Sequence, residues 1–178
     1  QKKRHLTPKM VESMGKARKG FEMVGYFRMI HFQVEEIPSF VFEMKNLRHL
    51  EIHNNRVKRI SPQIGKLRHL SRLVLSSNLL CSLPDTIGSL KELHRVVFLG
   101  NKLNKFPSML LHCPEIQYLN LGTNRIQSTP ENPGELRHLK RLDLSGNLLT
   151  SFPRLACHQP NLEILKIQHN KIETVPEC

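Results

Sequence analysis

Hydrophobic positions in this chain follow a pattern that repeats every 23 residues from residue 24 onward. Each copy reads LxxLxLxxNxLxxLPxxIxxLxx, and the copies begin at Val24, Leu47, Leu70, Leu93, Ile116, Leu139 and Leu162. Apolar and polar residues alternate in the LxxLxL portion, which predicts a short strand with its leucines on one side. A single copy cannot cover its own leucines, so we expect the copies to stack and to bury them in one continuous core.

One polar residue interrupts each apolar run, an asparagine placed 23 residues after the previous one. The chain has to turn out of each strand while it is buried, so its backbone N–H and C=O groups need partners there. An asparagine side chain carries both donors and an acceptor and can bridge successive turns. We therefore predict a structural asparagine ladder rather than a ligand or catalytic site. Its members are Asn55, Asn78, Asn101, Asn124, Asn147 and Asn170, and Phe32 takes the place of the asparagine in the first copy.

These copies resemble the leucine-rich repeat family over residues 24–178. The stretch SLPDTIGSL (82–90) is similar to the intracellular, Ras-suppressor-like subclass, whose members are mostly protein-binding scaffolds. The resemblance implies an α/β fold, a right-handed solenoid or horseshoe with a parallel β-sheet on its concave face. Short helical or irregular segments are expected on the convex face. Residues 24–178 would then form seven leucine-rich repeats, the last of them incomplete.

The repeat pattern is broken at a few places. Ser61-Pro62 shifts the usual Leu-Pro step, and Thr129 replaces a core leucine. Pro133 and the stretch PRLACHQPN (153–161) remove apolar residues on the loop side. We expect an irregular outer face near repeats five and six, and an undisturbed sheet.

Residues 1–23 precede the repeats and are rich in basic side chains. Thr7-Pro8 is typical of a helix start, because threonine can cap the first turn and proline suits its first position. Apolar side chains between residues 8 and 19 fall close to helical spacing, so we predict an amphipathic capping helix over the first repeat. The chain lacks an initiator methionine and its seventh repeat is incomplete, so we also expect it to be part of a longer protein.

The net charge of +12 and the pI near 9.9 favour an acidic partner. The first residues lack the apolar stretch of a signal peptide, and no apolar run is long enough to span a membrane. The cysteines are isolated and lie in different repeats or at the end of the chain, which predicts no intramolecular disulfide. These features favour a cytoplasmic protein, which we expect to be a monomer. The four cysteines are Cys81, Cys113, Cys157 and Cys178.

Catalytic and cofactor signatures such as GxSxG, HExxH, the P-loop and GxGxxG are absent from the sequence. The pairs His112-Cys113 and Cys157-His158 are expected roughly 10 Å apart, two strand spacings, which is too far to share one zinc ion. We therefore predict no enzyme activity, no cofactor and no metal site.

Positions 3, 5 and 7 of each repeat are expected to point out of the strands onto the concave sheet. In the middle repeats they form a stripe of arginine and tyrosine beside apolar side chains that the core does not need. Such residues are enriched at the hot spots of protein interfaces. We predict a non-catalytic intracellular adaptor or scaffold that binds a protein partner here. The predicted partner-binding residues are Arg72, Val74, Arg95, Val97, Leu99, Tyr118, Asn120 and Arg141.

A basic edge is expected where the loops lead into the strands. It suits an acidic protein, a phospholipid head group or RNA phosphates. RNA is the less favoured partner, because only two tyrosines face outward as stacking platforms. A further alternative is a substrate-targeting or regulatory module of a longer enzyme such as a ubiquitin ligase. The basic edge consists of Lys45, Arg48, Arg68, His69, Lys91, His94, Arg137, His138 and Lys140.

Overall fold

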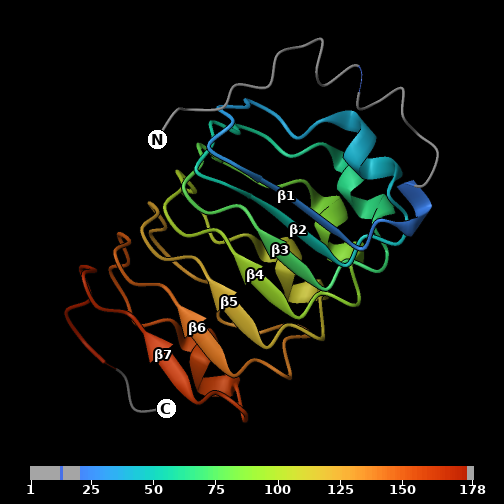
Figure 1. The fold of residues 1–178 in the computed structure, drawn as a ribbon. Coiled ribbons are helices and arrows are strands. Elements are labelled where there is room, and N and C mark those ends of the chain that lie inside the picture. Colours follow the sequence, from blue (N-terminus) through green and yellow to red (C-terminus); the bar gives the residue numbers. More distant parts are fainter. Residues whose placement is uncertain (1–12, 14–20, 176–178) are drawn as a thin grey trace.

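The computed structural model describes residues 13 and 21–175, in which the strands form one sheet of seven parallel strands (Figure 1). The strands pair in the order of the sequence, and each paired residue lies 23 positions from its partner, as Arg72 does from Arg95. The predicted solenoid with a parallel sheet on its concave face is therefore confirmed. The strands are β1 (Tyr26–Ile30), β2 (His49–His53), β3 (Arg72–Val74), β4 (Arg95–Val97), β5 (Tyr118–Asn120), β6 (Arg141–Asp143) and β7 (Ile164–Lys166).

Short 3₁₀ helices follow most of the strands on the convex side of the sheet (Figure 1). Each helix after the first begins where a backbone N–H donates to the carbonyl of the cap residue, as Ile87 does to Pro84 at 3.1 Å. In η3 the side chain of Ser61 also caps the helix, so the shifted Ser61-Pro62 step still starts a helix. The helices are η1 (Phe21–Met23), η2 (Ser39–Glu43), η3 (Pro62–Lys66), η4 (Asp85–Ser89), η5 (Ser108–His112) and η6 (Arg154–His158).

The fifth repeat has no convex helix within residues 124–140, all of which the structure describes. In the repeats that form a convex helix, the first hydrogen bond of the helix is donated by an ordinary residue such as Ile87 or Ala156. The 23-residue spacing places Pro133 at this position, and proline has no N–H to donate. The chain turns instead through Gly134, which has a φ of +59°. The irregularity expected near repeats five and six is thus present in repeat five, whereas repeat six forms η6 and the prediction is wrong there.

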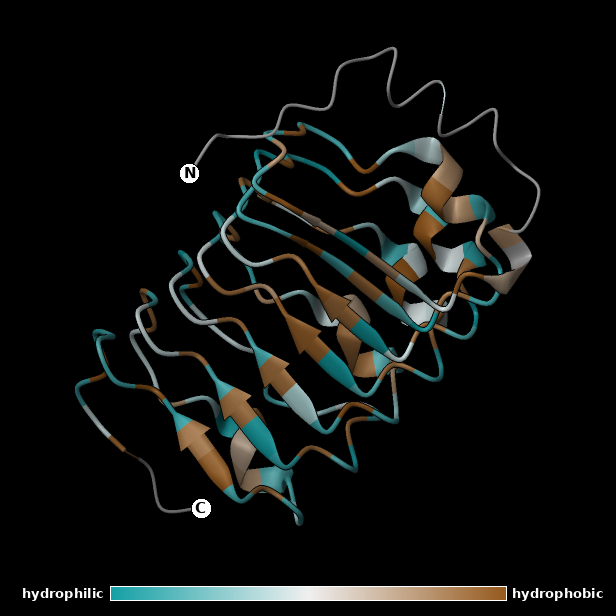
Figure 2. Ribbon diagram, in the orientation of Figure 1, coloured by the Kyte–Doolittle hydropathy of each residue, from teal (hydrophilic) through white to brown (hydrophobic). Residues whose placement is uncertain are grey.

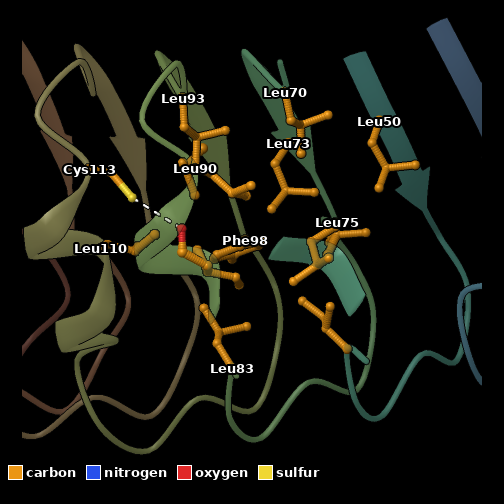
Figure 3. Close-up of a cluster of buried hydrophobic side chains, with 14 of the residues drawn as sticks. Leu50, Leu70, Leu73, Leu75, Leu83, Leu90, Leu93, Phe98, Leu110 and Cys113 are labelled. Atoms are coloured by element: carbon orange, nitrogen blue, oxygen red, sulfur yellow. Dashed lines mark hydrogen bonds between the residues drawn. The ribbon is translucent and has the colours of Figure 1, made fainter. Parts of the chain in front are cut away.

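The hydrophobic core lies between the sheet and the convex segments. In Figure 2 the strands carry both hydrophobic and hydrophilic positions, as half-buried strands must. The leucines of the third repeat, Leu70, Leu73 and Leu75, are completely buried, and Figure 3 shows them with Phe98 in the interior. Cys113 belongs to the same cluster and donates a 3.4 Å hydrogen bond to the Ile87 carbonyl. Burial raises the pKa of this thiol to about 11, so Cys113 is an inert core residue.

One cysteine departs from the expectation of free thiols. Cys157 is held in a disulfide, whereas Cys81 and Cys113 are free. Cys178 lies outside the described residues. The prediction of no intramolecular disulfide is therefore wrong. The prediction assumed that isolated cysteines cannot reach one another. Cys157 in η6 is only half-buried, however, and so is less enclosed by the core than Cys113. The argument from isolated cysteines to a reducing, cytoplasmic compartment no longer holds.

Two further expectations concern the ends of the chain and the membrane. The predicted capping helix over residues 8–19 lies outside the described residues, apart from Ser13, and stays a prediction. None of the helices in the described part of the chain has the length and hydrophobicity needed to cross a bilayer.

Candidate functional site

The repeated asparagines lie where each strand turns toward the convex side, and each one links its own repeat to the repeat before it. In Asn101, Oδ1 accepts a hydrogen bond from the Leu80 N–H at 3.0 Å. Its Nδ2 donates to the carbonyls of Leu75 and Phe98, each at 3.0 Å. The same three bonds recur at Asn78, Asn124, Asn147 and Asn170. These amides are engaged with backbone groups, so they are not available to a ligand.

The first asparagine, Asn55, belongs to the second repeat, and the first repeat carries Phe32 in place of an asparagine. Its Oδ1 accepts from the N–H groups of both Phe32 and Val34, and its Nδ2 donates to Met29. The ladder therefore extends to the first repeat through backbone groups alone, although no asparagine stands there.

The residue before each ladder asparagine has left-handed backbone geometry, a feature that the sequence analysis missed. Only glycine adopts this geometry without strain, yet just two of the six positions before an asparagine are glycines. The sequence indicates this geometry only weakly, because the six residues are of different types and have in common only that each is small or polar. The backbone φ values are +56° at Asn54, +53° at Ser77, +68° at Gly100, +53° at Thr123, +64° at Gly146 and +58° at His169.

The register of the sheet places the predicted partner-binding residues in two neighbouring columns. One column runs through Arg72, Arg95, Tyr118 and Arg141, and the next through Val74, Val97 and Asn120. The members differ in how much surface they offer to a partner. Leu99 is 38 % exposed, whereas Val97 is 9 % and Asn120 is 7 % exposed. Val97 and Asn120 therefore form the floor of this face more than its contact surface.

Two residues of the face stack on each other. The guanidinium carbon of Arg95 lies 3.7 Å from the centroid of the Tyr118 ring, a cation–π contact. The Nε atom of Arg95 is enclosed and has no hydrogen-bond acceptor among the described residues. Next to this pair, Asn120 donates to Asp143 at 3.2 Å and accepts from the Gly122 N–H at 2.9 Å. The stack is thus held in place on a floor whose own polar groups are satisfied.

A buried carboxylate, Glu51, lies near the N-terminal end of the same face, and the sequence analysis missed it. Tyr26 donates to Glu51 at 3.1 Å. The Nε atoms of Arg28 and Arg72 lie 3.6 Å and 3.2 Å from its two oxygens. The pairing of Arg28 with Glu51 on adjacent strands was a usable signal, because opposite charges that face each other across strands attract. Burial and the nearby Arg28 lower the pKa of the neighbouring His53 below its usual value.

The basic edge is partly neutralised by carboxylates of the next repeats. His69 lies 2.9 Å from Glu92, and Lys91 lies 3.5 Å from Glu135. These pairs are half-exposed, so they contribute little to stability, but they lower the positive charge of the edge. Among the described residues, no three His, Cys, Asp or Glu side chains are grouped so as to hold a metal ion.

Several solved structures have the same fold. A leucine-rich repeat protein of Leptospira interrogans superposes with a TM-score of 0.68 at 21 % identity, over 97 % of this chain and 54 % of its own. An internalin of Listeria monocytogenes gives 0.72 at 18 % identity, over 85 % and 43 % of the two chains. The ectodomain of the Arabidopsis thaliana receptor kinase GASSHO1/SCHENGEN3 gives 0.68 at 28 % identity, over 76 % and 17 %. This chain therefore spans about half of these neighbours or less.

Comparison of the sequence itself gives the family. No curated protein matches the chain. A family model described as two copies of leucine-rich repeats matches residues 45–92, and one described as leucine-rich repeat matches residues 114–172. Leucine-rich repeat domains generally mediate protein–protein interaction and are generally non-enzymatic. The two matches together cover more than half of the sequence, and the chain belongs to the leucine-rich repeat family.

Proposed function

We propose that this chain is a non-catalytic adaptor or scaffold module that binds an acidic protein partner on its concave face. The observation that carries the proposal is the Arg95–Tyr118 stack beside the exposed Leu99. Arginine, tyrosine and an apolar neighbour are the combination found at the energetic centre of protein interfaces. Stacking holds the guanidinium in place before a partner arrives, so less conformational entropy is lost on binding.

The charges on the face support an acidic partner. Five basic side chains lie in the two columns of the sheet, namely Arg28, Arg72, Arg95, Arg141 and Lys166, against the two acidic side chains of Glu51 and Asp143. An excess of positive charge attracts an acidic partner and speeds its association.

Two structural neighbours support a protein or peptide as the partner. The GASSHO1/SCHENGEN3 ectodomain was solved in complex with CASPARIAN STRIP INTEGRITY FACTOR 2. The ectodomain of the Arabidopsis receptor kinase HAESA, which is 26 % identical in sequence, was solved in complex with a peptide hormone ligand. This chain covers only 17 % and 24 % of those two proteins, so their ligands are not carried over to it.

The test is to titrate a captured partner against variants of the face. Arg95→Ala and Tyr118→Ala should each weaken the complex by roughly 1–3 kcal/mol, mostly through a faster off-rate. Leu99→Asp should abolish the complex without unfolding the domain, because the side chain points away from the core. Arg137→Ala, on the basic edge, is the control and should alter only the on-rate and its salt dependence.

The opposite result identifies the competing site. If Arg137→Ala is the severe variant and the three concave variants bind normally, the partner docks on the basic edge. A steep fall of binding with salt, together with competition by single-stranded RNA, would then indicate a nucleic acid.

A further inference from the structure

The arginines of the concave face are not equivalent. Arg28 and Arg72 both approach the buried carboxylate of Glu51, at 3.6 Å and 3.2 Å. Glu51 is 9 % exposed and also accepts a hydrogen bond from Tyr26. A carboxylate in a protected site attracts both of the guanidinium groups that lie next to it. Arg72 is therefore already ion-paired within the fold, although its Nε, like that of Arg95, makes no hydrogen bond there.

Arg95 and Arg141 have no such partner. Within the part of the chain that the structure describes, neither has a carboxylate oxygen within 4.0 Å. Arg95 lies over the ring of Tyr118, and Arg141 is the neighbour of Tyr118 on the other side in the same column. Arg141 also lines a hollow of about 100 Å³ together with Tyr118, Ile164, Lys166 and the carboxylate residue Asp143. Two unpaired guanidinium groups thus flank one aromatic ring.

An apolar surface lies at a fixed distance from Arg95. Arg95 and Val97 in β4 and Leu99 just after it alternate with the fully buried Val96 and Phe98, so they face the same side, and the strand rise puts Arg95 and Val97 about 6.6 Å apart. An extended peptide has the same spacing between side chains two residues apart. A peptide that places a carboxylate at Arg95 therefore places its next side chain on that face over Val97 and Leu99.

We propose that Arg95 and Arg141, and not Arg72, together bind one carboxylate of the partner beside Tyr118, and that the partner segment is extended and acidic, with an apolar side chain two residues from that carboxylate. This inference rests on the proposed function and specifies its ligand. Glu51 is a positioning residue, since its ion pair holds Arg72, and the partner is then bound by residues of repeats four to six. A partner that only supplies anions would leave the apolar surface of Leu99 uncovered, which is why we favour a peptide over RNA.

The test uses a terminally blocked, fluorescein-labelled peptide of sequence Ser-Glu-Ser-Leu-Ser-Glu-Ser, titrated against the whole chain at low salt. Arg95→Gln should weaken binding about tenfold and Arg141→Gln about fivefold. Arg72→Gln and Arg137→Gln remove the same charge and should each change binding by less than about twofold. A peptide with serine in place of leucine should bind about tenfold more weakly to the unmodified chain.

A second variant tests the role of Glu51. Glu51→Gln frees the guanidinium of Arg72, so it should strengthen peptide binding about threefold. Unchanged or weaker binding by a folded Glu51→Gln protein contradicts the inference. Circular dichroism melting checks that each variant is folded, and the four arginine variants test the proposal even if Glu51→Gln does not fold.

The outcomes separate this inference from the function on which it rests. If Arg72→Gln causes the largest loss, the inference is wrong and binding on the concave face stands. If Arg137→Gln causes the largest loss, both are wrong. If the peptide does not bind the unmodified chain while a captured partner still depends on Leu99, only the inference fails.

Discussion

The turn that follows each strand and the convex segment behind it belong to the same 23-residue repeat, yet they are conserved from copy to copy to very different degrees. The asparagine makes the same three backbone hydrogen bonds from Asn78 to Asn170, and a left-handed residue always precedes it. The convex 3₁₀ helix, in contrast, is missing from the fifth repeat. Even there the core stays closed, because Leu136 is only 1 % exposed.

The difference has a physical cause. In the turn, backbone donors and acceptors are buried, and a buried group without a partner is costly. Only a side chain with both donors and an acceptor satisfies them, so the position admits little besides asparagine. On the convex side the requirement is an apolar side chain over the core, which several backbone conformations can supply. Three predictions test this contrast, from the largest expected effect to the smallest, and a fourth concerns the concave face.

Removing a ladder asparagine should have the largest effect. Asn101→Ala leaves the Leu80 N–H and the carbonyls of Leu75 and Phe98 without their partner. We expect a loss of about 3 kcal/mol in the free energy of unfolding, measured by urea denaturation. Lys102→Ala, at the exposed neighbouring position, is the control and should cost less than about 0.5 kcal/mol. Equal losses for the two variants would show that the ladder does not stabilise the array.

The convex turn of repeat five should be the next most sensitive place. A Cβ at Gly134 would lie 2.8 Å from the Leu111 Cβ and 2.9 Å from its carbonyl oxygen, and φ is +59°. Gly134→Ala should therefore destabilise the protein by about 2 kcal/mol. Gly25→Ala is the matched control, since its Cβ would meet its nearest neighbour at 4.0 Å. If Gly134→Ala is as mild as Gly25→Ala, the convex turn is looser than the structure indicates.

At the left-handed positions, removing a glycine and introducing one should change the stability of the protein in opposite directions. Gly146→Ala puts a side chain at a φ of +64° and should cost about 1 kcal/mol. Thr123→Gly relieves a β-branched residue at +53° and should stabilise the protein by about 0.5 kcal/mol, after the entropy that glycine adds to the unfolded chain. The comparison of their thermal melts is decisive, because a loss at both positions would mean that Thr123 is not strained.

The smallest effect should come from His53. Its pKa is below 6.5 in the folded protein, first because of burial and then because of Arg28. The unfolded chain therefore binds a proton more readily, and the stability contributed by neutral His53 is present above pH 6.5 and decreases as the pH falls toward the folded pKa. The melting temperature of wild type relative to His53→Gln should be higher at pH 7.5 than at pH 5. A constant difference between the two pH values would contradict this assignment.

The sequence predicted the parts of the molecule that obey one rule in every copy. The leucine spacing and the asparagines determine the strands, their register and the turn positions, because each copy faces the same neighbours. What was missed depends on single side chains. The Glu51 cluster needs the reach of two long arginines, and the missing helix follows from Pro133 alone. The disulfide at Cys157 was missed because the four cysteines are isolated in the sequence.

The ladder also gives the array a polarity along its axis. Asn147 bonds to the N–H of Ile126 and the carbonyl of Leu121, both in the repeat before its own, so every turn is completed by the repeat that follows it. If the array is cut on the C-terminal side of a repeat, the turn of that repeat loses the asparagine that bonds its backbone. If the array is cut on the N-terminal side, the turns that remain keep their asparagines. The two edges of the solenoid are therefore unequal. In any array of such repeats, wherever it ends, fraying should begin at the C-terminal edge and advance toward the N-terminus, one repeat at a time.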